Sequence, residues 1–188
     1  DALTDGGAYI GKFTSVEATT SEKTGAKGVH FAFDSPGSGK TDFTLWTQGQ
    51  DGTKYFGFDQ LQGLMFLMGV KSLKSMKAKI NGWGENEKGD RVQMEMDGFT
   101  FPDLVGKPIG VVFQQELYTT GKGGTGSRLN LYGAFQPETK LMMSEIKERK
   151  TTPVKLDRLL KGLKVKDTRK ASAAEPAQPS LGVGAGDY

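Results

Sequence analysis

One short run of the sequence suggests nucleotide chemistry. Gly37-Ser38-Gly39-Lys40-Thr41 ends as the phosphate-binding loop of nucleotide hydrolases does. That loop requires a glycine at the position of Asp34, and it requires a following helix whose first amides hold the phosphates. Residues 42–46 instead alternate apolar and polar side chains, as a strand does. The run therefore predicts the turn of a hairpin, and nucleotide hydrolysis is not expected.

The other reactive side chains form no catalytic pattern. The chain has a single histidine, His30, and no cysteine, which excludes disulfides, thiolate chemistry and zinc sites built from those ligands. Five carboxylates lie close together in a glycine-rich polar stretch and would suit magnesium: Glu85, Glu87, Asp90, Glu95 and Asp97. Solvated surface is the simpler interpretation of such a stretch. We therefore expect no enzyme activity and no cofactor, with a metal-dependent nuclease as the remaining enzymatic alternative.

Aromatic side chains on the polar side of strands give the stronger signal. Trp46 and His30 fall on the polar side of two alternating segments, and Tyr132 and Arg128 fall on the polar side of a later one. Aromatic rings stack on unpaired bases with little sequence preference, at about 1–3 kcal/mol per base. Packing under a loop or helix is the alternative for any one ring. Further candidates are Tyr9, Tyr55, Tyr118 and Trp83.

Basic side chains accompany these rings. Lysines at predicted strand ends and turns are placed to follow phosphates: Lys12, Lys27, Lys40, Lys54, Lys107 and Lys122. The whole chain of 188 residues has a formal net charge of +3. Residues 140–170 alone hold eleven Lys/Arg against four Asp/Glu, whereas the rest of the chain is slightly acidic. This asymmetry suggests a polyanionic partner, with a solvated lysine-rich helix as the alternative.

The central element that must position Trp46 is a hairpin over residues 28–47. Val29, Phe31 and Phe33 share one face of its first strand, and Phe43 and Leu45 share one face of its second. A cluster of Pro, Gly, Ser and Lys at 35–40 separates the two strands, as expected for a turn. The apolar face predicts the core, and the opposite face carries His30 and Trp46.

The remaining elements predict a small β-barrel with one helix. Residues 8–18 read as a strand with Gly11 at a bend, which suits a barrel corner shared between two layers. Residues 58–70 read as a buried helix that starts with an Asp59–Gln62 capping box and stops at Gly69. Residues 71–80 are rich in lysine and could form a helix or an irregular segment. Residues 81–97 are predicted to form a polar loop that contains a short strand at 91–96.

Two further strands and a C-terminal segment complete the prediction. Residues 109–117 and 128–135 form a second hairpin, with inward Ile109, Val111, Phe113 and Leu117 on the first strand and Leu129, Leu131 and Phe135 on the second. Helical periodicity follows at 141–150 and 154–163, where a leucine stripe suits docking on the body or on a partner. Residues 171–188 are rich in Ala, Pro, Gly and Ser, which predicts disorder. No run approaches the roughly 20 apolar residues of a membrane span, so no membrane partner is expected.

The order of three strands, one helix and two strands is that of a five-stranded Greek-key barrel of the OB type. The front of the chain, GAYIGKFTSVEATTSEKTGAKGVHFAF, resembles bacteriophage-encoded single-stranded DNA-binding proteins of this type. Leu104-Val105-Gly106-Lys107 resembles the family's lead into its fourth strand, and Asn130-Leu131-Tyr132-Gly133 resembles its closing strand. The similarity covers residues 8–136.

The resemblance implies binding and protection of single-stranded DNA, without catalysis, during phage replication, recombination or repair in the host cytoplasm. It also implies recruitment of replication or recombination proteins through the acid–aromatic terminus Asp187-Tyr188. We expect a binding domain at 1–136, a basic helical extension at 137–170 that extends the charged surface or mediates self-association, and a tail at 171–188. The alternative is a non-catalytic protein-interaction or assembly module that docks through Leu156–Leu163.

Overall fold

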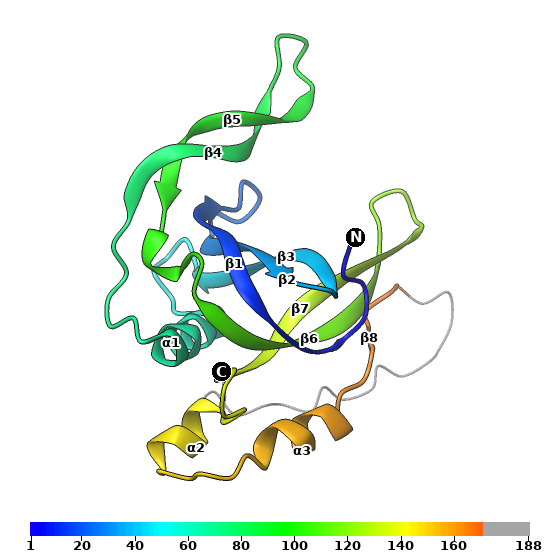
Figure 1. Ribbon diagram of the computed structural model, residues 1–188. Helices are drawn as coiled ribbons and strands as arrows, with labels where there is room; N and C mark the ends of the chain where they lie inside the picture. The colour runs from blue at the N-terminus through cyan, green and yellow to red at the C-terminus, as the bar shows by residue number, and fades with distance from the viewer. Residues whose placement is uncertain (171–188) are drawn as a thin grey trace.

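The computed structural model describes residues 1–170, so the tail expected to be disordered at 171–188 lies outside the described part (Figure 1). Within it, eight strands form one connected and mainly antiparallel sheet, which confirms the mainly-β class. The strands are β1 (Gly7–Thr20), β2 (Lys27–Ser35), β3 (Gly39–Gln48), β4 (Met76–Glu85), β5 (Arg91–Thr100), β6 (Pro108–Thr119), β7 (Thr125–Phe135) and β8 (Lys166–Asp167). The helices are α1 (Phe56–Met68), α2 (Met143–Lys147) and α3 (Lys155–Lys161), with a 3-10 turn, η1, at Pro102–Leu104. No helix in residues 1–170 is long and apolar enough to cross a membrane.

Strand β1 joins the two halves of the sheet. Its residues 12–20 pair with β2, and its residues 7–12 pair with β6. Gly11 lies at the changeover, where a Cβ would stand 2.2 Å from the carbonyl oxygen of Asp34. Only glycine therefore allows the strands to approach so closely, and the predicted corner strand is confirmed. The register shift itself lies two residues later, between Phe13 and Ser15.

The core is built from phenylalanines of these strands. The rings of Phe13, Phe31, Phe33, Phe43 and Phe113 contact one another, and Phe31 and Phe43 are stacked with centroids 5.0 Å apart. All five are at most 6% exposed. The predicted inward face of the 28–47 hairpin is therefore confirmed, and its outward face is left for other contacts.

The sheet is not closed into a barrel, contrary to the prediction. No ladder joins β3 to β7, and the first turn of α1 lies at this seam. A Cβ on Gly57 would stand 2.2 Å from the carbonyl oxygen of Trp46, so the helix contacts β3 directly. The side-chain amide of Gln60 donates a hydrogen bond to the carbonyl oxygen of Leu131 on β7, at 3.0 Å. Helix–strand contacts thus replace the missing strand pairing.

The start of α1 was also predicted wrongly. The helix begins after Tyr55, which makes no side-chain capping bond, and not at an Asp59–Gln62 capping box. Its end agrees with the prediction, because Gly69 adopts the left-handed conformation at φ 71° and donates to the carbonyls of the last turn. The earlier start matters because it places Tyr55 and Phe56 beside β3.

Residues 76–100 form a two-stranded arm. The short strand predicted at 91–96 is confirmed as part of β5, whereas β4 replaces the expected helical or irregular segment and much of the expected polar loop. Strands β4 and β5 pair along their full length from Met76–Thr100 to Glu85–Arg91. β5 meets β1 at a single pair, Glu17–Thr100, so the arm projects beyond the body (Figure 1). The sequence pattern was misleading because three glycines interrupt the alternation on one face of the arm.

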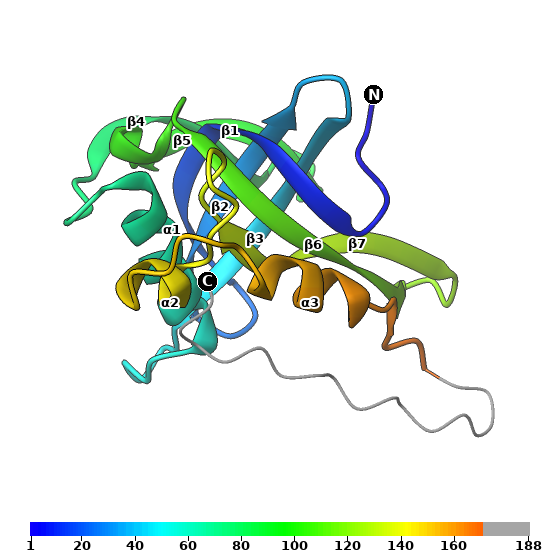
Figure 2. The ribbon, with the colours of Figure 1, turned by 60° about the horizontal axis from the view of Figure 1, so that its bottom comes forward.

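The basic extension docks on the body of the protein. Leu156 of α3 and Met142 pack with Val112 and Phe135 in a second apolar cluster, along the outer side of β6 and β7 (Figure 2). Phe135 belongs to this cluster, so its predicted position in the main core is wrong. The physical reason is a bulge in β7: one extra residue, Tyr132, lies between Leu131 and Gly133, which pair with the adjacent Phe113 and Val112. The faces of β7 therefore reverse beyond this point, while β6 keeps its alternation.

A buried carboxylate fixes the two short helices of the extension. Glu145 is fully buried, and its oxygens accept backbone hydrogen bonds from Met142 at 3.1 Å and Val154 at 2.9 Å. Burial alone would raise the pKa of Glu145, but these backbone bonds and the charge of Lys155 lower it. One side chain therefore joins the start of α2 to the start of α3.

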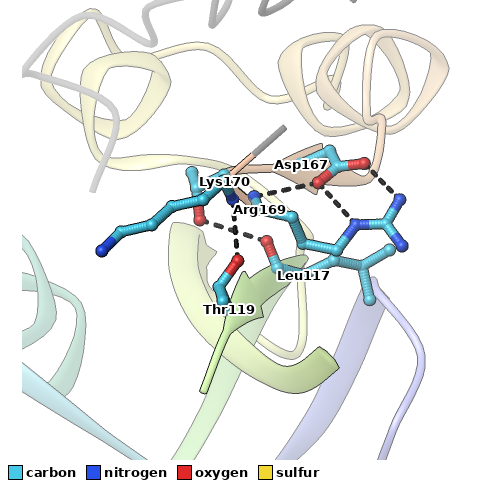
Figure 3. Close-up of polar contacts among 6 residues, drawn as sticks. Leu117, Thr119, Asp167, Arg169 and Lys170 are labelled. Atoms are coloured by element: carbon cyan, nitrogen blue, oxygen red, sulfur yellow. Dashed lines mark hydrogen bonds and ion pairs between the residues drawn. The ribbon is translucent and has the colours of Figure 1, made fainter. Parts of the chain in front are cut away.

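The extension ends as a short strand beside β6. β8 pairs in parallel with residues 116 and 117, and Thr168 donates its N–H to the carbonyl oxygen of Leu117 at 2.8 Å (Figure 3). The N–H of Lys170 then donates to the hydroxyl of Thr119 at 2.7 Å (Figure 3). The chain therefore leaves the described part near the tip of the β6–β7 hairpin.

Candidate nucleic-acid interface

Trp46 lies on the outer face of β3 and is 38% exposed. Its strand partner is Gly28 of β2, and a Cβ at Gly28 would stand 2.9 Å from the indole Cε3. The indole therefore lies against the bare backbone of its neighbour. This contact holds the ring at the surface, where one part of it remains accessible.

A groove of about 280 Å³ opens beside Trp46 at the seam between β3 and β7. Tyr55 and Phe56 line its helical side and are 43% and 47% exposed. Polar atoms are supplied by Thr44, Gln60 and Asn130. Three accessible aromatic side chains thus meet at one hollow, with hydrogen-bonding groups at its floor and rim.

The turn after β3 brings the two further rings into place. The N–H of Tyr55 donates to the carbonyl oxygen of Thr47 at 3.0 Å, so the chain folds back on β3. Asp51 stabilises the turn by accepting the N–H of Thr53 at 3.0 Å, and this bond lowers the pKa of Asp51. Sequence reasoning named Tyr55 only as a further candidate and missed Phe56. The sequence signal that could have identified Phe56 was the run Lys54-Tyr55-Phe56, which follows the Asp51-Gly52 turn after one residue.

A second hollow of about 470 Å³ brings together two of the predicted lysines, Lys27 and Lys54. The ammonium group of Lys54 lies 4.3 Å from the ring centroid of Phe58. Neither lysine has an ion-pair partner within residues 1–170. Their charges are available to an anion near the same end of β3 that carries Trp46.

His30 is held by hydrogen bonds on the same outer face. Its Nδ1 lies 2.9 Å from the hydroxyl of Thr44, and its Nε2 lies 3.2 Å from a carboxylate oxygen of Asp42. Both ring nitrogens are therefore engaged within the sheet. His30 therefore lies on the same face of the sheet as Trp46 but does not line the groove.

The other predicted lysines lie at the margins of this face. Lys12 and Lys107 are exposed near the β1–β6 junction, Lys122 is exposed in the β6–β7 turn, and Lys40 is exposed 3.9 Å from Asp34. Glu17, Asp34 and Asp42 on the same face offset nearby cations. Positive charge therefore lies mainly toward the edges of the face, and the exposed indole of Trp46 lies nearer its centre.

Tyr132 and Arg128 are not brought to this groove. Tyr132 is half-buried and packs against the second apolar cluster, under the basic extension. Arg128 donates from Nε to a buried carboxylate oxygen of Glu116 at 2.5 Å, and its guanidinium lies 4.8 Å from the Tyr118 ring. The predicted second platform is therefore not formed, because the extension covers Tyr132 while Arg128 stays exposed but is paired with Glu116.

Glu116 was missed because the alternation of β6 places it on the outer face, where a carboxylate is expected to be solvated. In the structure β8 and Thr168 of the basic extension cover this outer position, so Glu116 is only 4% exposed, and Leu117 is half-buried. Burial alone would raise the pKa of Glu116. Hydrogen bonds from Arg128, Asn130 and Thr168, with the charge of Arg128, hold that pKa at about 2. This ionised group secures the end of the extension to β6 and β7.

The five carboxylates of 85–97 are spread along the arm and its turn. Across residues 1–170, no three His, Asp or Glu side chains are grouped closely enough to hold a metal ion. The sequence matches no protein-family model, and it matches no curated protein.

Proposed function

We propose that this chain binds single-stranded DNA in a sequence-tolerant manner and protects it without catalysing a reaction. The observation that carries the proposal is the meeting of Trp46, Tyr55 and Phe56 at one groove. Exposed rings in a polar-edged hollow suit stacking on unpaired bases, because every base has an aromatic face. Lys27 and Lys54 stand nearby to contact phosphates.

The proposal includes a finer description of the fold. Strands β1, β2, β3, β6 and β7 correspond to the five strands of an OB-type Greek key, with α1 between the third and fourth. The arm is then an insertion after the helix, and the seam between β3 and β7 is open. On this reading the outer face of β2 and β3 is the binding face, as in OB domains that bind oligonucleotides.

The biological setting of the proposal follows from the sequence resemblance alone. It places the protein in phage DNA replication, recombination or repair, in the cytoplasm of the host. Recruitment of other replication or recombination proteins would depend on Asp187-Tyr188, which lies outside the described residues. Self-association of the chain is part of the same proposal, since many single-strand binders act as oligomers or cooperative arrays.

The competing proposal of a protein-interaction module rested on a free leucine-rich helix. Leu156 is 6% exposed, and Leu159, Leu160 and Leu163 pack against the second cluster of the body. Most of this leucine stripe is therefore packed against the body of the same chain and is not free to dock on a partner. This placement favours the nucleic-acid proposal over docking through residues 156–163.

The test is a titration of a fluorescently labelled single-stranded oligonucleotide, with a duplex of the same sequence in parallel. Trp46→Ala and Tyr55→Ala should each weaken single-strand binding about 5- to 150-fold, the equivalent of ~1–3 kcal/mol per stacked base. Phe66→Ala is the matched control, because Phe66 is 39% exposed but lies near Lys147 and outside the groove. Absence of single-strand binding, or equal effects of all three changes, would reject the proposal.

A further inference from the structure

The arm has one apolar face. On this face lie Met76 and Ile80 of β4 with Met94, Met96 and Val92 of β5, since directly paired residues point to the same side. Met76 is 55% exposed, and Met94 and Met96 are each 38% exposed. The other face carries charged and polar groups, including the Lys79–Asp97 ion pair at 2.5 Å, together with Trp83 and Phe99, which are 53% and 44% exposed. Such an uncovered apolar face on a projecting element marks an interaction surface.

Glycines form the floor of this surface. A Cβ on Gly82 would stand 2.0 Å from the sulfur of Met96, and one on Gly84 would stand 2.2 Å from the sulfur of Met94. Gly98 likewise lies under Ile80, whose Cδ1 would be 2.3 Å from a Cβ. The methionines therefore lie flat across bare backbone and present their thioethers along a smooth, shallow surface.

The apolar face is continuous with the face that carries Trp46. The pairs Thr44–His30, His30–Glu17, Glu17–Thr100 and Thr100–Met76 link β3, β2, β1, β5 and β4 in turn. Side chains of paired residues share a face, so this row runs along one side of the sheet. Four strand spacings of about 4.8 Å separate Thr44 from Met76, or about 19 Å.

Cations border the apolar surface at the base of the arm. Lys71 and Lys74 are exposed, and neither has an ion-pair partner within the described chain. Lys77 is also exposed, but it points to the opposite face because it directly follows Met76 in β4. At the other end of the arm, Arg91 pairs with Glu22 of the β1–β2 loop at 2.5 Å, which links the arm to the body. Unpaired positive charge beside a flat apolar surface complements a strand of phosphates and bases.

We propose that the methionine face of the arm is a second part of the single-strand binding surface, on which bases rest after the strand crosses from Trp46 over β2 and β1. This inference rests on the proposed function and extends it to residues outside the groove. Methionine suits the role because its flexible thioether makes favourable contacts with aromatic rings of varied shape. A second copy of the chain, covering the same surface through its own arm, is the competing occupant.

The first test is oxidation footprinting of the wild-type chain with hydrogen peroxide and mass spectrometry. A saturating single-stranded oligonucleotide should slow oxidation of Met76, Met94 and Met96 at least several-fold. Unchanged oxidation in a bound complex would overturn the inference. Slowing that appears without oligonucleotide as protein concentration rises would also overturn it, in favour of self-association.

The second test compares the two faces of the arm by oligonucleotide titration. Met94→Ala/Met96→Ala should weaken single-strand binding about tenfold, whereas Asn81→Ala/Gln93→Ala on the opposite face should leave it unchanged. If the two double variants bound with equal affinity and Trp46→Ala still weakened binding, the inference about the arm would be wrong and the proposed function would stand. If the wild-type chain bound no single strand at all, the proposed function itself would fail. Circular dichroism of each variant checks that the arm remains folded.

Discussion

Trp46 lies directly over Gly28, its partner across the β2–β3 ladder. The absence of a side chain at position 28 lets the indole lie on the sheet, and no other residue type would leave that space. This relationship links the local sequence of the hairpin to the candidate site. The orientation of the ring depends on the residue opposite as much as on the tryptophan itself.

We predict that Gly28→Ala both destabilises the hairpin and reorients the indole. The new Cβ would stand 2.5 Å from the carbonyl oxygen of Leu45 and 2.9 Å from Cε3 of Trp46. Overpacking of this kind costs about 1–3 kcal/mol. Urea unfolding measures the loss of stability. In a Trp83→Phe background, Trp46 is the one remaining tryptophan, so the fluorescence emission of Gly28→Ala reports on the environment of Trp46 alone. Unchanged emission and stability would contradict the close contact.

Elements with unbroken periodicity could be predicted from sequence. Val29, Phe31, Phe33, Phe43 and Leu45 are all buried as expected, because strict alternation decides which face of a half-buried strand points inward. The helix before Gly69 was found by its 3.6-residue spacing. Trp46 was found because a large ring on a polar face has no explanation within the strand itself.

Features that depend on long-range pairing could not be predicted. A bulge at Tyr132 of β7 moves Phe135 to the second cluster. Glu116 is buried because the end of the extension, 50 residues further along the chain, covers the outer face of β6. The arm was missed because Gly82, Gly84 and Gly98 replace apolar side chains that would have marked its face. The open seam follows from Gln60 bonding to β7, a contact between residues 71 positions apart.

Salt dependence should report on the two lysines of the second hollow. Each phosphate contact on a single strand contributes about 0.7 to the slope of log K against log salt concentration. Lys27→Gln and Lys54→Gln should therefore each reduce that slope by about 0.7. Lys150→Gln is the control, because Lys150 is already paired with Glu148 at 3.0 Å. Slopes that are equal for all three variants would show that the hollow does not contact phosphates.

Acid should weaken the protein through Glu116. Its pKa is about 2 in the folded chain and near 4.5 when unperturbed, so its contribution to stability is present above pH 4.5 and is lost as the pH falls toward 2. The difference corresponds to on the order of 3 kcal/mol at neutral pH. Glu116→Gln should lose most of this at pH 7 and show a flatter decline between pH 5 and 2. Chemical unfolding across that range measures both effects.

Asp167→Asn is the control for the acid prediction. The pKa of Asp167 is also about 2, because the side chain and backbone N–H of Arg169 donate hydrogen bonds to it. These partners are only two residues apart, so the unfolded chain can form the same contact and the net effect on folding is small. A loss of stability as large as that of Glu116→Gln would contradict this account.

Glu145 should govern whether the basic extension stays docked. Glu145→Ala removes the acceptors of the N–H groups of Met142 and Val154, and Met142, a residue only 1% exposed, is then left with a buried N–H that has lost its acceptor. Such a loss costs about 1–3 kcal/mol per group. Because α2 and α3 are short and depend on this side chain, the extension should open more often than the sheet unfolds.

Limited trypsin digestion should then cut the exposed lysines and arginines of residues 147–170 several-fold faster in Glu145→Ala than in the wild type. Glu148→Ala, which breaks only the exposed pair with Lys150, should leave the cleavage rate unchanged. Equal rates for both variants would show that the apolar cluster alone holds the extension.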